Sequence, residues 1–582
     1  MLKLFKNISK KDWLLVFASL GLIAVQVWLE LTMPDYMSEI TFLVQTSESS
    51  ISSIFKAGGK MLLCALGSLV SAVIVAILAS RIASDFAAAL RSRLFNKVQD
   101  FSMEEIGRFS TASLITRTTN DVTQVQMFIT MGLQVMVKAP ILAIWAVIKI
   151  AGKNTNWTLT TGAAVVSLLI VVCSCLLISL PKVKKLQMLT DNLNRVTREN
   201  LNGIKVVRAY NAEKYQQDKF EVANDELTGT HLFVGRTMAF MMPGIQLIMN
   251  GLSLAIYWVG AYMIDRALPM DRVALFSDMI VFMQYAAQVV MAFMMLVMIF
   301  VILPRASVAA KRINEVIDTD TTIHDGDREN APEGVKGEVE FKNVSFKYPD
   351  AEDYVIKNIN FKVKKGETLA IIGATGSGKS TTINLIPRFY DTTEGEVLVD
   401  GINVKEYRQE SLRNLIGYVS QKAILFSGDI ESNIKYGENK NDGGDVKKAV
   451  NIAQAAEFVD KLEEGYNAYV AQGGENFSGG QKQRLSIARA IYRNPEILIF
   501  DDSFSALDYK TDRILRSELK KECKDATKII VAQRIGTIRD ADKIVVLDDG
   551  EIAGIGTHSE LMKDCETYRQ IAYSQLSKEE LA

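Results

Sequence analysis

The chain has 582 residues, of which 48% are hydrophobic and 23% charged, and its formal net charge is −1. These averages combine an apolar N-terminal half with a polar C-terminal half, so the net charge indicates no partner, and we expect no nucleic-acid partner. The five cysteines and three histidines show neither disulfide nor metal-ligand spacing, which excludes a disulfide-rich protein and argues against a structural zinc site.

Six apolar stretches precede residue 310, and each is close to the ~20 residues that a membrane-spanning helix needs. The first is too long for a removable signal peptide and lacks a small-residue cleavage site, so we interpret it as retained. We therefore expect an all-α membrane domain with six spans at residues 1–313. The predicted spans run from Trp13 to Met33, Met61 to Ile82, Phe128 to Ile150, Trp157 to Leu180, Phe240 to Ile264 and Val273 to Leu303.

Lysines and arginines cluster before the first span, from Lys3 to Lys11, and after the fourth, from Lys182 to Arg208. Such clusters mark the cytoplasmic side. An even number of spans then places both termini and the C-terminal half in the cytoplasm, so we expect a multi-pass protein of the cytoplasmic membrane. The long connections on this side, 83–127 and 182–239, have helix-favouring composition and are predicted to be helical extensions of the spans.

The chain turns polar and acidic at residues 314–336, as expected of a linker between domains. A second domain is therefore predicted at 337–582. Near its end, Asp549-Gly550 is a strong turn signal between two apolar runs, and it predicts a β-hairpin from Lys543 to Ile552.

A glycine-rich loop follows the apolar run from Leu369 to Ile372 and precedes a helix-competent stretch. In this setting the glycines let backbone N–H groups close around phosphates, Lys379 reaches the β and γ oxygens, and the Ser380 hydroxyl takes a place on Mg²⁺. The loop predicts binding of a nucleoside triphosphate. The residues we assign to this phosphate site are Gly373, Thr375, Gly376, Ser377, Gly378, Lys379, Ser380 and Thr381.

Two further patterns belong to the same chemistry. The run Ile497-Leu498-Ile499-Phe500 predicts a buried strand that ends in Asp501 and Asp502, and Asp501 is placed to hold Mg²⁺. About 20 residues earlier, Phe477-Ser478-Gly479-Gly480-Gln481 opens a predicted helix. A Ser-Gly-Gly turn at a helix N-terminus is a second device for contacting phosphate.

With six spans followed by these motifs in this order, nearly the whole chain resembles the ATP-binding cassette (ABC) exporter half-transporters. The resemblance implies an α/β P-loop cassette with an antiparallel β subdomain that begins with residues Gly337 to Val363, and with a helical insert after Gln421. It implies that ATP and Mg²⁺ bind, that Tyr348 stacks on adenine, and that Gln421 reaches the metal and the reacting phosphate. The resemblance further assigns nucleotide contacts to Phe477, Ser478, Gly479, Gly480, Gln481 and Asp508.

Two catalytic positions depart from the family pattern. Asp502 stands where the family has Glu, and a side chain one methylene shorter withdraws the carboxylate by about 1.5 Å. Gln533 stands where the family has the switch His, and a neutral amide cannot supply its positive charge. Loss of a positioned acid or base typically removes ~10²- to 10⁴-fold in rate. We therefore expect this site to bind ATP and hydrolyse it poorly.

In the family, each ATP site combines the P-loop of one cassette with the signature turn of another, and the signature here looks intact. This predicts a heterodimer in which a second, non-identical half-transporter carries the active site. Short cytoplasmic helices, which the resemblance places near Ile106 to Thr116 and Lys205 to Glu213, would transmit force to the spans. The alternative is an active homodimer in which Asp502 and Gln533 are neutral variants.

The transported substrate is less clearly indicated. Polar groups inside spans often face a cavity or a partner, and methionine-rich helices suit promiscuous apolar surfaces. Both kinds of residue are also explained by ordinary helix packing, and Glu30 could simply reach water. The candidate substrate contacts are Gln26, Glu30, Gln284, Gln288, Met291 and Met295.

Three functions remain open. We favour a subunit that exports amphipathic drugs or lipids, because spans and cassette are fused in one chain. A peptide exporter subunit is the second possibility. The third is a regulatory ATP-binding membrane subunit without transport activity of its own, which the degenerate site suggests.

Overall fold

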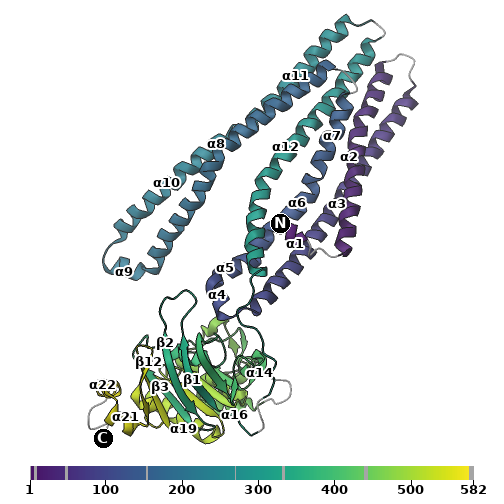
Figure 1. Ribbon diagram of the computed structural model, residues 1–582. Helices are drawn as coiled ribbons and strands as arrows, with labels where there is room; N and C mark the ends of the chain where they lie inside the picture. The colour runs from purple at the N-terminus through teal and green to yellow at the C-terminus, as the bar shows by residue number, and fades with distance from the viewer. Residues whose placement is uncertain are drawn as a thin grey trace. The chain divides into compact units, whose positions relative to one another are not determined.

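The computed structural model describes residues 2–5, 10–45, 50–151, 155–268, 271–330, 334–437 and 444–575. The chain forms two compact units (Figure 1). Unit 1 comprises Met1–Gln99 and Ala112–Thr319, and unit 2 comprises Asp100–Thr111 and Asp320–Ala582.

Unit 1 is all-α, and among the described residues six helical segments are long and apolar enough to cross a membrane. This confirms the predicted six-span membrane domain. The third segment is interrupted by two π-helical turns. The helices are α1 (Leu2–Phe5), α2 (Lys10–Gln45), α3 (Ile51–Gln99), α5 (Thr111–Thr116), η1 (Arg117–Asp121), α6 (Val122–Met131), η2 (Gly132–Met136), α7 (Lys138–Ala151), α8 (Thr155–Asn202), α9 (Ile204–Ala209), α10 (Glu213–Ala239), α11 (Met241–Arg266) and α12 (Arg272–Ile317).

The helices run well beyond the predicted spans. α3 continues unbroken to Gln99 and α8 to Asn202, so these connections are helical extensions as expected. Two boundaries differ from the prediction. α12 ends at Ile317, so the first residues of the predicted linker 314–336 are helical. The short helix predicted from Ile106 to Thr116 is two helices, α4 (Met103–Phe109) and α5, because Ser110 has a φ of 56° and breaks the helical path.

The core of unit 1 lies where α2, α7, α8, α11 and α12 pack together. Large side chains fill it, and the rings of Trp157 and Phe282 lie 5.3 Å apart. The exposed faces of these helices remain strongly apolar, as with Leu14, Leu177 and Leu247. Apolar residues on the outside of a helical bundle are typical of contact with lipid.

Unit 2 contains two larger sheets (Figure 1). The first is antiparallel with strand order β2-β1-β4-β5, and the second has the order β12-β11-β3-β10-β9-β6 with parallel pairing from β11 to β6. This confirms the predicted α/β cassette. The strands are β1 (Val339–Phe346), β2 (Ile356–Val363), β3 (Thr368–Gly373), β4 (Glu394–Val399), β5 (Ile402–Asn403), β6 (Ile416–Val419), β7 (Gly428–Asp429), β8 (Tyr469–Val470), β9 (Ile497–Asp501), β10 (Thr527–Val531), β11 (Lys543–Asp548) and β12 (Glu551–Gly556).

The central strands are apolar throughout because both faces of the sheet are covered. In β9, Ile499 belongs to the core between the two sheets, whereas Leu498 and Phe500 belong to the core under the helices. β3 alternates in the same way: Ile371 belongs to the core between the two sheets, and Ile372 belongs to the core under the helices. These strands fix the positions of the loops that follow them.

Helices flank the larger sheet, and the helical insert predicted after Gln421 contains α15 to α17. The hairpin β11–β12 turns at Asp549 and Gly550, whose φ angles are 45° and 83°. The helices are α13 (Lys379–Asn384), α14 (Gln409–Asn414), α15 (Ile430–Ile434), α16 (Val446–Ile452), α17 (Ala456–Val459), η3 (Gly465–Asn467), η4 (Gln472–Gly474), α18 (Gly479–Tyr492), α19 (Tyr509–Glu522), α20 (Ile535–Ile538), α21 (His558–Asp564) and α22 (Glu566–Gln575).

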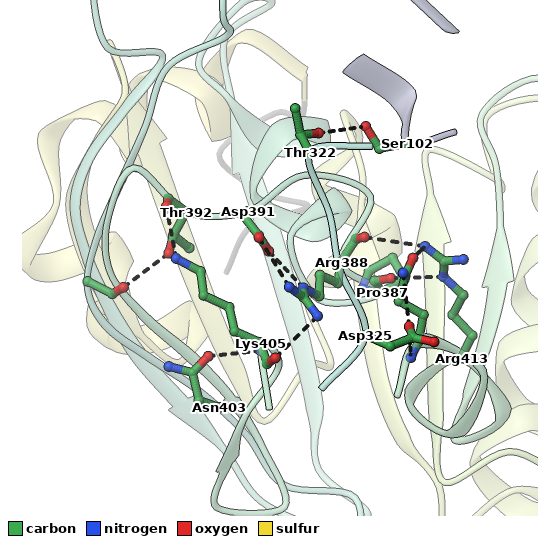
Figure 2. A network of polar contacts seen from close by, with 12 residues as sticks. Ser102, Thr322, Asp325, Pro387, Arg388, Asp391, Thr392, Asn403, Lys405 and Arg413 are labelled. Carbon is green, nitrogen blue, oxygen red and sulfur yellow. Dashed lines mark hydrogen bonds and ion pairs between the residues drawn. The ribbon is translucent and has the colours of Figure 1, made fainter. Parts of the chain in front are cut away.

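The short helix α4 belongs to unit 2 through one buried carboxylate. Glu105, only 2% exposed, accepts hydrogen bonds from Ser102 N at 2.7 Å and from Thr322 N at 2.9 Å. The hydroxyls of Ser102 and Thr322 lie 3.1 Å apart (Figure 2). Glu105 therefore serves both as the capping-box partner of α4 and as an anchor for the chain that enters the cassette.

That entering chain is tied in turn to the segment after α13 (Figure 2). Asp325 Oδ1 accepts from Gln409 N and Nε2, at 3.1 and 3.0 Å, and Gln409 Oε1 accepts from Arg413 at 2.9 Å. Arg413 also donates to the carbonyls of Pro387 and Arg388. Hydrogen bonds therefore connect Asp325 to the segment that directly follows α13, the helix after the phosphate loop.

Candidate functional site

The phosphate loop lies between β3 and α13, as the sequence predicts. Gly376 and Gly378 have φ angles of 88° and 90°, which L side chains rarely adopt. A side chain at Gly373 would meet the Leu547 carbonyl oxygen at 2.1 Å. These glycines therefore allow a tight loop whose backbone amides converge at the N-terminus of α13.

Lys379 lies across this loop. Its Nζ donates to the carbonyl oxygens of Gly373 at 2.9 Å and Ala374 at 2.6 Å. Burial lowers the pKa of the Lys379 ammonium, and the carboxylates of Asp502 and Asp501 oppose this shift. The Lys379 ammonium is thus held by two backbone carbonyl oxygens. A bound phosphate could replace these contacts, because its negative charge is a stronger partner for the ammonium.

Oxygen ligands suited to Mg²⁺ meet beside Lys379. Ser380 Oγ donates to Asp501 Oδ1 at 2.8 Å, and Asp501 is the last residue of β9. Burial raises the pKa of the Asp501 carboxyl, while the Ser380 hydrogen bond and Lys379 lower it. Gln421 lines the same cavity. A hydroxyl, a carboxylate and an amide oxygen form the donor set that a hard divalent cation prefers, so these residues fit Mg²⁺.

The two atypical catalytic residues contact one another. Gln533 Nε2 donates to Asp502 Oδ2 at 2.8 Å, and Asp502 N donates to Val531 O at 3.0 Å. Burial raises the pKa of the Asp502 carboxyl, and hydrogen bonds from Ser505, Gln533 and Gln421 lower it. Asp502 also has a φ of 45°, a left-handed conformation that fixes the direction of its short side chain.

These residues surround one cavity of about 350 Å³. Ten predicted site residues line it. Val355 and Val531 line it as well, and sequence reasoning missed both because neither carries a chemical group that a motif would mark. The ten predicted residues are Thr375, Gly376, Gly378, Lys379, Ser380, Thr381, Gln421, Asp501, Asp502 and Gln533.

Tyr348 lies beside this cavity without lining it. Its hydroxyl is 3.2 Å from Thr381 Oγ1, and its ring packs edge-on against Phe346 and Tyr390, with centroids 5.0 and 5.3 Å away. The ring is only partly buried. Tyr348 therefore has an accessible aromatic surface next to α13, as a base-stacking residue requires.

The signature turn is formed but lies outside the lining of this cavity. Ser478 caps α18 through a reciprocal capping box, in which Ser478 Oγ accepts from Gln481 N at 3.3 Å and Ser478 N donates to Gln481 Oε1 at 2.9 Å. Ser478 and Gly479 are exposed, and Phe477 is buried. Asp508 caps α19 by accepting from Thr511 N. The N-terminus of α18 is thus preorganised and accessible.

In unit 1, three substrate candidates converge on one ion pair. Glu30 Oε1 lies 2.9 Å from Lys138 Nζ and accepts from Gln26 at 2.9 Å and Ser68 at 3.2 Å. Gln288 Nε2 lies 3.5 Å from the Glu30 backbone oxygen. The charge of Glu30 is therefore balanced inside the protein, rather than being directed to water or left to attract a cation.

The other candidates lie apart from this cluster. Gln284 and Met291 are exposed on α12, Met295 is partly buried, and no recorded hydrogen bond links Gln284 to Glu30 in the described part of the chain. The structure adds a second ion pair that sequence reasoning missed, between Asp35 and Lys149, and Tyr285 OH donates to Asp35 at 2.7 Å. The sequence signal for this ion pair was Asp35, an acidic residue just after the predicted first span.

Comparisons with known proteins bear on the whole chain. Residues 13–308 match the family described as ABC transporter transmembrane region, and residues 356–505 match that described as ABC transporter. An uncharacterized ABC transporter ATP-binding protein of Mycobacterium tuberculosis is 40% identical over 525 residues, covering 89% of this chain and 87% of that protein. An ATP-dependent lipid A-core flippase of Pseudomonas savastanoi pv. phaseolicola is 33% identical over 474 residues, covering 81% and 78%.

A solved structure gives the same picture of the fold. The structure of a bacterial Atm1-family ABC exporter with ATP bound aligns with a TM-score of 0.80, covering 97% of this chain and 98% of that one. Its sequence identity is 23%, so the likeness concerns the fold alone.

Proposed function

Since this chain belongs to the ABC transporter family, as an exporter half-transporter with fused spans and cassette, we propose that it works as one half of a heterodimer. In this proposal its own ATP site is degenerate, and the partner supplies the site that turns over. The exported substrates are amphipathic, either lipids or drugs. The cassette and both termini face the cytoplasm.

The observation that carries this proposal is the contact between Gln533 and Asp502. A general base must reach the proton that it removes within hydrogen-bonding distance. Here the base position has a short carboxylate whose Oδ2 is occupied by a neutral amide. Gln533 cannot gain the positive charge that would stabilise a leaving phosphate. Both features favour retention of ATP over hydrolysis.

The remaining residues support ATP binding. The loop amides and Lys379 would hold the phosphates, and Ser380, Asp501 and Gln421 would hold Mg²⁺. Bound Mg²⁺ would neutralise phosphate charge. Because the binding residues are complete and the catalytic residues are altered, this site is suited to keeping ATP at the cassette interface through several partner turnovers.

The exposed signature turn supports the second half of the proposal. A complete phosphate site needs a helix N-terminus opposite the P-loop, and Ser478 and Gly479 of this chain are ordered by the capping box without lining the chain's own cavity. This chain can therefore complete the partner's site even if its own site hydrolyses ATP slowly.

Two observations support an amphipathic substrate. The relatives include proteins named lipid A-core flippases, and the inner helices combine a polar cluster around Glu30 with apolar and methionine side chains on α12. Amphipathic molecules need both kinds of surface. Sugars and ions would leave the apolar surface without contacts.

Purification of the tagged chain in mild detergent from its native membrane tests the proposal. We expect a second ABC polypeptide in equal amount, and ATP hydrolysis that a P-loop Lys variant of the partner abolishes. Recovery of a dimer of this chain alone, with full ATPase activity, would contradict both the heterodimer and the degenerate site. Assembly of both chains with no ATP-dependent movement of a fluorescent lipid or dye in vesicles would favour a regulatory role.

A further inference from the structure

A groove at one end of unit 1 combines exposed aromatic side chains with a cation that has no carboxylate partner among the described residues. It lies between the first turns of α8 and the last turns of α11, at the end of the bundle where α11 leads to α12 (Figure 1). Its volume is about 720 Å³. We call it the terminal groove; Asn156, Leu159, Thr160, Trp258, Tyr262 and Arg266 line it.

The cation is Arg266, the last residue of α11. Its guanidinium carbon lies 4.0 Å from the centroid of the Tyr262 ring, which is its one recorded contact among the described residues. No carboxylate in this part of the chain forms an ion pair with it. Arg272, by contrast, donates to the backbone carbonyls of Asp265 and Ala267. The charge of Arg266 is thus oriented by an aromatic ring and left without an anion.

The aromatic residues follow one face of α11. Trp258, Tyr262 and Arg266 are spaced four residues apart, and Trp258 and Tyr262 are 74% and 54% exposed. This stripe covers about 12 Å along the helix at 1.5 Å per residue. Leu159 of α8, 68% exposed, lies across from it. The groove therefore changes from cationic at the helix end to apolar further into the bundle.

This gradient matches one kind of ligand. Trp and Tyr side chains prefer the headgroup level of a bilayer, and in a bilayer the apolar faces of α8 and α11 below them would contact acyl chains. Arg recognises phosphate oxygens bidentately, and Asn156 and Thr160 are polar residues in the lining of the same groove, where the Thr160 hydroxyl donates to Asn156 O at 2.9 Å. We propose that the terminal groove binds an anionic phospholipid, with the headgroup phosphate on Arg266 and an acyl chain along Trp258 and Leu159. This inference is independent of the heterodimer and of the exported substrate.

Quenching of Trp258 fluorescence by brominated lipid tests it in the full chain. The protein is reconstituted in phosphatidylcholine vesicles that contain either dibrominated phosphatidylglycerol or the same amount of dibrominated phosphatidylcholine. The signal of Trp258 is obtained by subtracting that of a W258F variant made in each background. We expect phosphatidylglycerol to bind about fivefold more tightly, which is the effect of about 1 kcal/mol for one basic side chain near an anionic headgroup.

Three variants make the result specific to the groove. R266Q should reduce the ratio of the affinities for phosphatidylglycerol and phosphatidylcholine to about one. R266K keeps the charge and should retain most of the preference for phosphatidylglycerol. K60Q is the matched control, because Lys60 is another cation over an aromatic ring, 5.7 Å from the Tyr36 centroid, and lies outside the groove. It removes the same net charge and should leave the preference unchanged.

Four outcomes would overturn the proposal. Equal quenching by both lipids in the wild type would mean ordinary boundary lipid. Equal losses in R266Q and K60Q would mean general charge attraction. Absence of quenching at Trp258 by either lipid would mean that protein covers the groove. Loss of the preference on addition of millimolar glycerol phosphate would identify a free phosphate compound as the ligand.

Discussion

The side-chain amide of Gln533 donates a 2.8 Å hydrogen bond to the carboxylate of Asp502, so the two atypical residues of the nucleotide site form one unit. The backbone around Gln533 is also fixed. Gln575 of α22 donates to Gln533 O at 2.7 Å and accepts from Ile535 N at 2.8 Å. In the proposed degenerate site, an anchored amide that occupies the base position would account for slow hydrolysis better than either substitution would separately.

Restoring both catalytic residues should activate this site. In the complex purified from its native membrane, D502E combined with Q533H should raise ATP hydrolysis at this site by about 100-fold or more, because it returns a longer base and an ionisable imidazole. Either change alone should give much less, since the two side chains contact one another. Single-turnover release of phosphate, with the partner's site inactivated, measures the effect.

The gain must depend on ATP held in the P-loop. Adding K379A to the double variant should abolish it, because Lys379 is the cation at the phosphate position. If D502E with Q533H leaves the rate unchanged while ATP binding stays intact, the degenerate-site explanation is wrong.

Removal of the Asp501 carboxylate, the proposed Mg²⁺ ligand, should weaken nucleotide binding only when Mg²⁺ is present. D501N keeps an oxygen that can accept from Ser380 but loses the charge that a divalent cation needs. We expect at least about a tenfold weaker affinity for a fluorescent ATP analogue in Mg²⁺, which corresponds to ~1.4 kcal/mol, and no difference from wild type in EDTA. D445N, at a carboxylate that caps α16 outside the cavity, is the matched control. Equal effects of D501N and D445N would contradict the assignment of Asp501 to the metal site.

The ion pair between Glu30 and Lys138 should be a stabilising contact inside the membrane domain. Either E30Q or K138M leaves a charge unpaired in an apolar bundle, and breaking such a pair typically costs about 3 kcal/mol. The double variant E30Q with K138M removes both charges and should recover most of the loss. Thermal unfolding of the reconstituted protein measures the three variants.

An exposed pair on the same unit provides the comparison. Arg81 and Asp85 lie 3.8 Å apart with 72% and 55% of their side chains exposed, so D85N should change little. If the double variant at Glu30 and Lys138 loses as much stability as the two single variants added together, the two charges do not stabilise one another.

A carboxyl pair in the cassette, formed by a buried and a partly buried residue, should make the stability of the cassette depend on pH. Asp400 is fully buried, and Glu496 lies within hydrogen-bonding reach of it. Burial, with a smaller contribution from Glu496, raises the pKa of Asp400 from 3.8 to about 6, and hydrogen bonds from the Glu338 and Gly337 amides oppose this shift. Asp400 Oδ2 and Glu496 Oε2 receive no other hydrogen bond among the described residues, so one proton satisfies both oxygens.

The sign of the effect follows from proton binding. Between about pH 4 and 6 the folded cassette holds a proton that the unfolded chain has lost, so its stability falls as pH rises through this window. The full shift corresponds to about 3 kcal/mol. D400N mimics the protonated form, and it should unfold at a higher temperature than wild type at pH 7.5 and show a flatter pH profile. E496Q should flatten the profile too. If the dependence of the unfolding temperature on pH is unchanged in both variants, Asp400 and Glu496 do not share a proton.

Much of the nucleotide site could be predicted from local sequence. The P-loop, the strand that ends in Asp501 and the capped signature turn each depend on residues adjacent in the chain, and parallel strands bring their carboxyl ends to one edge. The boundaries were less predictable. α12 continues into the predicted linker because residues 314–317 are compatible with helix, and the break at Ser110 reflects a backbone conformation that no motif marks.

The sequence by itself determined the family, the six spans and the chemistry of the phosphate site, because apolar length and local motifs specify them. Only the tertiary structure decided which charges pair. Glu30 meets a lysine 108 positions away, Asp400 meets Glu496, and Arg266 meets no carboxylate among the described residues. Such pairing depends on the packing and register of separate helices and strands. The sequence specifies the charge of each side chain, but which opposite charge it pairs with depends on the distance between them in the folded chain.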